Sequence, residues 1–328
     1  MLNIVEFKKE LFNTDYHSFA YRAMLLFNYQ AENNDVYREF LQYLDITPSA
    51  VRSYSDIPFL PIELFRSRKI LTGNVDTEVY FESSGTTSEI NSRHYIADNK
   101  LYIDSLIRCF ELFYGDVKNY CILALLPSYI ERQNSSLVAM CNQLIHVSKQ
   151  TNNGFYLNDW EQLISAIQSN EENNITTLLI GVSFALMEFA EKYSISLKNT
   201  IIMETGGMKG RRKEITRQEL HAMLKNAFGL NTIHSEYGMT ELLSQAYSKK
   251  NGLFQTPPWM KVFVRDTEDP FKILAENKTG CLNIIDLANI HSCAFIATHD
   301  LGKTNEDGSF EVLGRFDNSE IRGCNLMF

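Results

Sequence analysis

The chain has 328 residues, of which 45% are hydrophobic and 22% are charged, and its formal net charge at pH 7 is −9. This composition is ordinary for a globular protein, and the length fits either one elaborate α/β unit or about two domains. The negative charge argues against nucleic acid as a partner, because binding to a phosphate backbone requires a dominant cationic surface.

The beginning of the chain and its cysteines indicate the compartment. The first residues, MLNIVEFKKELF, lack the cationic head and apolar stretch of a signal peptide, and no window is apolar enough to span a bilayer. Six cysteines are scattered without a CxxC pair or the spacing of zinc ligands. We therefore expect a cytoplasmic chain with reduced thiols and no integral membrane contact. Cys324, among polar residues and beside a glycine, is the cysteine that we expect to react.

The first segment predicts a helical N-terminal cap over residues 1–55. Phe, Tyr and Leu recur there at helical spacing, as in YRAMLLFNYQ and VYREFLQYL. The stretch DIPFLPIELF that follows carries two prolines among apolar residues, which favours an extended segment on the surface of the core.

Residues 56–254 predict an α/β core with a mainly parallel sheet flanked by helices. NYCILALLP is a continuous apolar run, typical of a strand buried on both faces, and from residue 158 helices and strands alternate. The last of these helices has a capping box, Thr216 and Glu219, and a stop at Gly229. Ligands of such sheets bind beyond the carboxyl ends of the strands. The predicted helices are NDWEQLISAIQS, SFALMEFAEKY and TRQELHAMLKNAFG, and the predicted strands are ITTLLIG, NTIIMETGG and NTIHSEYG.

The remaining chain predicts a small β subdomain of the same core over residues 255–314, followed by a hinge-like tail over residues 315–328 that carries Cys324. Short apolar runs are separated there by turn residues. The runs are MKVFVRD, FKILAE, GCLNIIDL, CAFIATHD and SFEVLGR.

Several segments carry residue types suited to binding a nucleotide. FESSGTTSEINSRH is rich in hydroxyl and backbone N–H groups and could wrap phosphate oxygens, although such a turn is often an ordinary loop. In EYGMTE, Tyr237 offers a flat face, Thr240 a hydroxyl and Glu241 an oxygen ligand for Mg²⁺; core packing of Tyr237 and a solvated Glu241 are the alternatives. Asp300 of THDLGK could bond a ribose diol and Arg315 a phosphate, while both segments also suit surface turns.

In this order and at these separations, SSGTTS, YGMTE, THDLG and GRFDNSEIRG resemble the motifs of the adenylate-forming superfamily of acyl-CoA synthetases, peptide-synthetase adenylation domains and luciferase. Within it the chain looks most like the LuxE-type acyl-protein synthetases of bacterial fatty acid reductase complexes. The segments that carry this likeness are SSGTTS with SRHY, GGMKGRRKEI, SEYGMTE and VLGRFDNSEIRGC, from about residue 60 onward. The resemblance implies the N-terminal core of that fold without its mobile C-terminal lid domain.

The resemblance also implies roles for individual residues, with ATP and Mg²⁺ as cofactors. Cys324 would be the acyl acceptor, Thr240 would contact the α-phosphate, and Glu241 would bind Mg²⁺. His94 replaces part of the usual phosphate loop, where it could bond the phosphates or orient the loop, a structural histidine being the alternative. The nucleotide-binding residues would be Ser83, Ser84, Gly85, Thr86, Thr87, Gly206, Gly207, Tyr237, Asp300 and Arg315.

The implied function is that of an acyl-protein synthetase. It would activate a carboxylic acid, a fatty acid by family default, to acyl-AMP and transfer the acyl group to Cys324 as a thioester for a partner of the acyl-CoA or fatty-acid reductase type. Two alternatives remain open: a carboxylate–CoA ligase, and a non-catalytic nucleotide- or acyl-binding subunit of a reductase complex. The identity of the acid cannot be read from the sequence.

Overall fold

The computed structural model describes residues 2–83, 91–127, 132–206 and 215–316. The chain divides into two compact units. Unit 1 comprises Met1–Val79, Ser92–Ala97 and Pro258–Phe328, and unit 2 comprises Tyr80–Asn91 and Asp98–Pro257. In the part of the chain that the structure describes, none of the helices combines the length and the apolarity of a membrane span.

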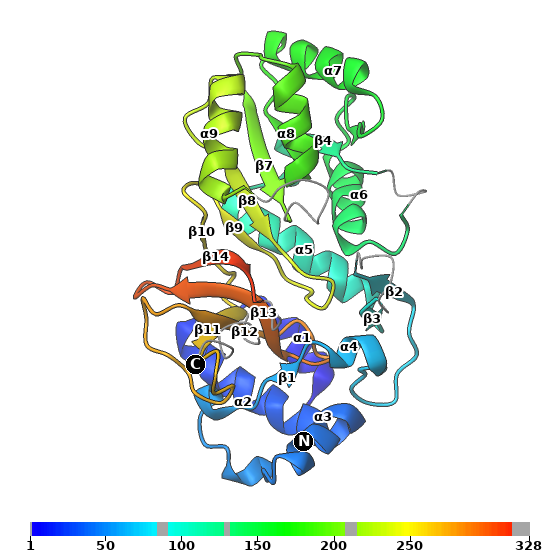
Figure 1. The fold of residues 1–328 in the computed structure, drawn as a ribbon. Coiled ribbons are helices and arrows are strands. Elements are labelled where there is room, and N and C mark those ends of the chain that lie inside the picture. Colours follow the sequence, from blue (N-terminus) through cyan, green and yellow to red (C-terminus); the bar gives the residue numbers. More distant parts are fainter. Residues whose placement is uncertain (1, 84–90, 128–131, 207–214, 317–328) are drawn as a thin grey trace, which may run out of the picture. The chain divides into compact units, whose positions relative to one another are not determined.

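Unit 2 is built on a mainly parallel sheet. The strands of this sheet are β4 (Cys121–Leu125), β5 (Gly154–Phe155), β6 (Thr177–Val182), β7 (Thr200–Thr205), β8 (His234–Tyr237) and β9 (Ala246–Ser248). Unit 2 also contains β10 (Leu253–Phe254), which is not a strand of this sheet. The order across the sheet is β5-β4-β6-β7-β8-β9, in which only β9 runs antiparallel to its neighbour (Figure 1). Every residue of β4 and β6 is buried, as their continuous apolar sequences require. The α/β fold and the parallel strands are therefore confirmed.

Helices cover both faces of this sheet. Side chains alternate along a strand, so His234 and Ser235 of β8 point to opposite faces. His234 Nδ1 lies 3.0 Å from the Tyr114 hydroxyl of α5, whereas Ser235 Oγ lies 3.4 Å from His221 Nε2 of α9. The helices are α5 (Asn99–Tyr114), α6 (Ser136–Ser148), α7 (Trp160–Glu172), α8 (Ser183–Lys192) and α9 (Arg217–Phe228), with the short 3₁₀ helix η3 (Val117–Asn119).

The caps of these helices follow the sequence. Asp159 caps α7 by accepting the backbone N–H of Gln162. In α9 the capping box is complete, because Thr216 and Glu219 each accept the other's backbone N–H. Gly229 ends α9 with φ at +64°, in the left-handed region that favours glycine. The predicted beginning and end of α9 are confirmed.

Unit 1 combines N-terminal helices with an antiparallel sheet. Its helices are α1 (Ile4–Leu11), α2 (Tyr16–Asn33), α3 (Asp35–Tyr43), η1 (Pro48–Ala50), η2 (Tyr54–Asp56) and α4 (Leu64–Ser67). Its strands are β1 (Leu60–Pro61), β3 (Arg93–Ile96), β11 (Met260–Arg265), β12 (Gly280–Asp286), β13 (Phe295–Thr304) and β14 (Phe310–Arg315), and β2 (Val79–Glu82) begins at its boundary. Strands β14, β13, β12 and β11 pair in that order, and β1 pairs parallel to β13.

One predicted strand of this region is wrong. FKILAE, residues 271–276, forms only an isolated bridge between Ile273 and Arg265. Phe271 is 58% exposed, and Ile273 and Leu274 are only half-buried, so no apolar residue of this run is fully buried in a core. The apolar residues of this run therefore did not indicate a strand.

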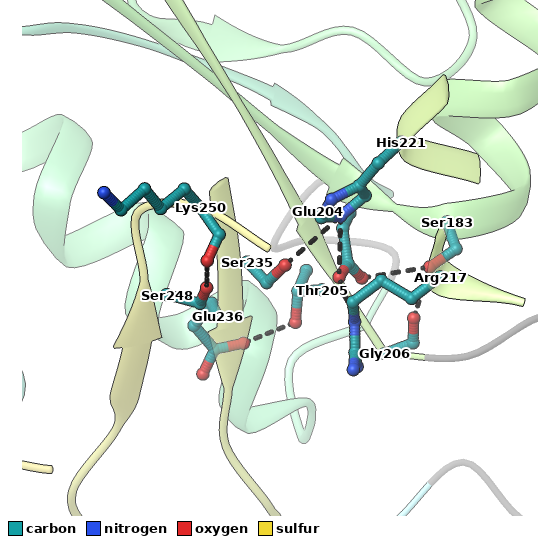
Figure 2. A network of polar contacts seen from close by, with 10 residues as sticks. All are labelled: Ser183, Glu204, Thr205, Gly206, Arg217, His221, Ser235, Glu236, Ser248 and Lys250. Atoms are coloured by element: carbon teal, nitrogen blue, oxygen red, sulfur yellow. Dashed lines mark hydrogen bonds and ion pairs between the residues drawn. The ribbon is translucent and has the colours of Figure 1, made fainter. Parts of the chain in front are cut away.

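A buried carboxylate, Glu204, connects β7 with α8 and α9 (Figure 2). Glu204 Oε1 accepts a hydrogen bond from Arg217 Nε at 2.9 Å and lies 3.6 Å from His221 Nε2. Its other oxygen lies 3.3 Å from Ser183 Oγ, at the first residue of α8. Only 3% of Glu204 is exposed, so these contacts replace the water that an ionised carboxylate would lose.

These partners keep Glu204 ionised. Burial alone would raise the pKa of Glu204, but the hydrogen bond with His221 and the charge of Arg217 outweigh it and lower the pKa below its ordinary value. A carboxylate with a lowered pKa stabilises the fold above the pKa of the unfolded chain, about 4.5, and loses that contribution as the pH falls through the folded-state pKa.

We expect Glu204→Gln to destabilise unit 2 by about 2 kcal/mol at pH 7, because it leaves the Arg217 charge without its buried counter-ion. The chain has two tryptophans, of which Trp160 lies in unit 2 and Trp259 in unit 1. Trp160 fluorescence in a Trp259→Phe background would therefore report urea unfolding of unit 2, and the difference should shrink as the pH falls below about 4.5.

The exposed Glu172 at the end of α7 supplies a matched control. Glu172→Gln should change the free energy of unfolding by no more than about 0.5 kcal/mol. Equal effects of the two substitutions would contradict the role of the buried pair.

Candidate functional site

The carboxyl ends of β7 and β8 lie beside each other in the sheet. Thr205, the last residue of β7, is paired in register with Glu236 of β8. The residues that follow, Gly206 and Gly238, therefore leave the sheet at the same edge. This edge brings Gly206 together with the predicted motif EYGMTE, at the place where open parallel sheets bind ligands.

Gly206 requires the conformational freedom of glycine. Its φ is +69°, in the left-handed region, and its carbonyl accepts a hydrogen bond from Ser183 Oγ. A side chain would strain this turn, and the turn leaves Gly206 exposed beyond the strand. Gly206 therefore offers open backbone at the sheet edge.

Tyr237 ends β8 and is packed within unit 2. It is 8% exposed, its hydroxyl lies 3.3 Å from Met239 Sδ, and its ring centroid lies 5.9 Å from that of Phe254. Arg217 in turn lies 5.1 Å from the centroid of the Phe254 ring, a cation–π contact. The Tyr237 ring is thus held by aromatic packing.

Thr240 and Glu241 follow β8 in a turn. Thr240 is half-buried, and Glu241 is 4% exposed. Among the described residues, no three or more His, Cys, Asp or Glu side chains form a group that could hold a metal. Mg²⁺ commonly binds through one or two carboxylates and the phosphates of its substrate, so a single Glu241 carboxylate fits that ion bound together with a nucleotide.

Ser83 lies in the wall of an open, polar hollow of unit 2 with a volume of about 440 Å³. Ser135, which lines the hollow, is the N-cap residue of α6, and its side chain accepts the backbone N–H of Val138. Arg132 brings a cation to the wall and Glu82 a carboxylate. The described lining residues are Glu82, Ser83, Asn91, Arg132, Gln133, Asn134 and Ser135.

Three further predicted residues lie in unit 1. Asp300 and Arg315 are paired in register between β13 and β14, with Arg315 Nε 3.8 Å from Asp300 Oδ1. The Arg315 side chain is 78% exposed, so this ion pair is weak and leaves the guanidinium accessible. His94 lies in β3, is 1% exposed, and packs edge-on against Phe65 with ring centroids 5.8 Å apart.

His299, the residue before Asp300, forms an ion pair with Glu63. Burial raises the pKa of Glu63, but hydrogen bonding to His299 outweighs it, with a further contribution from the Arg265 charge, so the net shift is downward. His299 therefore has a structural partner in Glu63, the residue that precedes α4.

Six of the predicted site residues lie outside the described residues, and their roles stay predictions. They are Ser84, Gly85, Thr86, Thr87, Gly207 and Cys324.

Sequence reasoning missed three residues of this region. Glu204 lies in the mostly apolar β7 and Glu236 in β8, and an acid inside a strand predicted to be buried was the available signal, because such an acid needs a partner or a proton. Glu236 accepts a hydrogen bond from Thr205 Oγ1, across the pairing of β7 and β8 (Figure 2). Arg132 follows the predicted strand NYCILALLP by a few residues and carried no pattern of its own.

The comparisons with known proteins support this fold. A family model described as acyl-protein synthetase, LuxE, matches residues 11–328. Among curated proteins, none matches the chain.

Several solved structures resemble the chain at low identity. ATP-bound MatB from Rhodopseudomonas palustris is 18% identical with a TM-score of 0.55, covering 74% of this chain and 49% of its own. O-succinylbenzoate CoA synthetase from Bacillus subtilis, with ATP and magnesium, is 16% identical with a TM-score of 0.52, covering 73% and 50%. 2-Hydroxyisobutyryl-CoA ligase, with 2-HIB-AMP and CoA, is 12% identical with a TM-score of 0.66, covering 96% and 71%.

The chain spans about half the length of the first two structures. At these identities the likeness establishes the fold, which is that of the core of adenylate-forming enzymes, as predicted. The family model covers nearly all of the sequence, and on that match the chain belongs to the LuxE acyl-protein synthetase family.

Proposed function

We propose that this protein is an ATP-dependent acid–thiol ligase that activates a carboxylic acid as an acyl-adenylate and then transfers the acyl group to Cys324. The observation that carries the proposal is the sheet edge of unit 2, where the ends of β7 and β8 bring Gly206 and the segment Tyr237–Glu241 together. The family match and the ATP- and AMP-containing structures of similar fold support the same reaction.

The first step joins two anions. A carboxylate oxygen of the acid attacks the α-phosphorus of ATP, the bond from that phosphorus to the bridging oxygen breaks, and pyrophosphate leaves. Because both reactants are negatively charged, the protein must hold them in position and neutralise their charge. The acid that we propose is a fatty acid, which is the family default.

The polar hollow beside Ser83 would bind the phosphates of ATP in this step. Ser83, the first residue of the phosphate-loop motif, and Asn91, which follows the motif, lie in its wall, and Arg132 supplies a cation. A guanidinium fits phosphate oxygens through two parallel hydrogen bonds. Together with Ser84, Gly85, Thr86 and Thr87 of the motif, Arg132 would receive the β- and γ-phosphates and steady the departing pyrophosphate.

The remaining nucleotide contacts are assigned by the family motifs. Gly206 and Gly207 would present backbone to the adenine, beside the Tyr237 ring, and Thr240 would hold the α-phosphate. Glu241 would bind Mg²⁺, which supplies a charge that neutralises the phosphates. In unit 1 the exposed Arg315 and the neighbouring Asp300 would contact the ribose or a phosphate, and His94 would support the phosphate loop.

The second step uses a thiolate. The Cys324 sulfur attacks the acyl carbon of the adenylate, the bond from that carbon to the AMP oxygen breaks, and AMP leaves with its electron pair. The product is a thioester on the protein, which an acyl-CoA or fatty-acid reductase type of partner would collect.

The proposal predicts that ATP–pyrophosphate exchange depends on a carboxylic acid. We expect one class of acid in a panel graded by chain length to stimulate exchange, and intact-mass spectrometry to show the protein gaining one acyl group. Cys324→Ser should abolish the DTT-labile acyl mass while leaving exchange within about twofold, because the adenylation step does not use the thiol.

The outcomes separate the alternatives. A CoA ester formed equally well by Cys324→Ser would identify a carboxylate–CoA ligase. ATP binding without exchange for any acid, even in the presence of a reductase partner, would leave a nucleotide-binding subunit and end the enzymatic proposal.

Arg132→Ala should raise the KM for ATP about tenfold, corresponding to about 1.4 kcal/mol, the usual weight of a hydrogen bond to a charged group. Steady-state exchange at varied ATP would measure it. Arg52→Ala, at an exposed arginine of unit 1, is the matched control and should leave the KM unchanged. An unchanged KM for Arg132→Ala would remove the hollow from the phosphate site.

A further inference from the structure

Glu236 is a buried acid at the sheet edge, and it has no role in the reaction proposed above. It lies in β8 directly before Tyr237 and is 6% exposed. Thr205 Oγ1 donates a hydrogen bond to Glu236 Oε2, which joins the last residue of β7 to β8 (Figure 2). Thr205 is followed by Gly206 and Glu236 by Tyr237, and both of these belong to the proposed nucleotide site.

The second carboxyl oxygen of Glu236 lies against Gly238. An ideal Cβ atom built on Gly238 would be only 2.4 Å from Glu236 Oε1. A side chain at position 238 would therefore displace the Glu236 carboxyl group, whereas the φ of Gly238 is not in the left-handed region and places no demand of its own. Through Thr205 and Gly238, one side chain fixes the geometry of both strand ends.

The side chains that face Glu236 are neutral at pH 7, so they would not compensate a negative charge on its carboxyl group. Glu236 shares its strand face with His234, and burial lowers the pKa of His234 to about 4, so that ring is neutral at pH 7. Burial raises the pKa values of the nearby thiol and phenols, which are therefore neutral as well. These are Cys141 of α6, Tyr114 of α5 and Tyr247 of β9.

The described cations near this face are engaged elsewhere. Lys249 lies 5.5 Å from the centroid of the Tyr114 ring, and its charge acts on His234. Lys250 contributes its carbonyl to Ser248, and its amine points away from Glu236 (Figure 2). The buried acid of the neighbouring strand β7, Glu204, is ionised and paired with Arg217 on the opposite face. The negative charge of Glu204 therefore disfavours ionisation of Glu236.

We propose that Glu236 works as a neutral acid, a positioning residue that holds the ends of β7 and β8 together for the nucleotide and the carboxylic acid to bind, and that its ionisation sets the alkaline limit of activity. The expected effect on activity rests on the proposed function, whereas the protonation of Glu236 does not.

The chemistry of the site supports a retained proton. Burial raises the pKa of Glu236 to about 7, the Thr205 hydrogen bond opposes the rise, and the Glu204 charge adds to it. The proton is therefore bound more tightly in the folded chain than in the unfolded chain, and it is lost as the pH rises through about 7.

An ionised Glu236 would oppose the reaction. Both substrates are anions, and a carboxylate without a counter-ion at this depth repels them through a medium of low dielectric. The same charge would also seek water and pull away from Gly238, which loosens the contact between the two strand ends.

The test compares pH profiles of ATP–pyrophosphate exchange. Exchange by the unaltered protein should fall tenfold for each pH unit above about 7, whereas Glu236→Gln, which keeps the shape without the charge, should hold its activity into the alkaline range. Thr205→Val removes the hydrogen bond that lowers the pKa of Glu236, so it should move the alkaline limit to higher pH. An alkaline fall that persists unchanged in Glu236→Gln would overturn the proposal.

A second measurement does not depend on activity. Infrared difference spectra, unaltered protein minus Glu236→Gln, should show a carboxylic acid band at pH 6 that gives way to a carboxylate band above about 7. The matched variant Glu204→Gln should instead remove a carboxylate band at pH 6, because Glu204 is ionised. A carboxylate band for Glu236 at pH 6 would overturn the inference even if the enzyme were active, and a protonated Glu236 in a protein without exchange would overturn only the proposed function.

Discussion

The parallel pairing of β7 with β8 is the constraint on which the candidate site depends. Parallel strands that pair in register end at the same edge of a sheet, so the residues that follow them must lie close together whatever their distance along the chain. Thr205 and Glu236 are 31 residues apart in sequence and are joined by a hydrogen bond. The helix between them, α9, has a complete capping box and a glycine stop, so its length and its return to the sheet are defined locally.

Two buried glutamates on these strands show how the same residue type serves opposite purposes. Glu204 faces α8 and α9, where Arg217 and His221 keep it ionised and connect two layers of the fold. Glu236 faces α5 and α6, where burial among neutral groups favours its protonated form. The difference arises from the partners that each face supplies, because an acid loses its solvation by a similar amount on either side of a buried sheet.

Much of the fold could be predicted from local patterns, and most of the site geometry could not. The apolar runs of β4, β6 and β7 and the two caps of α9 are short-range signals, and each proved correct. FKILAE failed because an apolar pattern says nothing about whether a core lies opposite, and Phe271 is exposed. The partners of Glu204 come from α8 and α9, and the hollow beside Ser83 is completed by Arg132, so both depend on long-range packing that spacing does not encode.

Side-chain alternation along β8 has a consequence for how this sequence can change. His234 and Glu236 project to one face and Ser235 to the other, and Gly238 accommodates the Glu236 carboxyl two positions later. Loss or gain of a single residue within this strand would turn the acid toward Arg217 and His221 and place a side chain where the glycine now lies. Relatives that keep the acid should therefore differ in this stretch by substitution and never by length, whereas the loops elsewhere are free to grow or shrink.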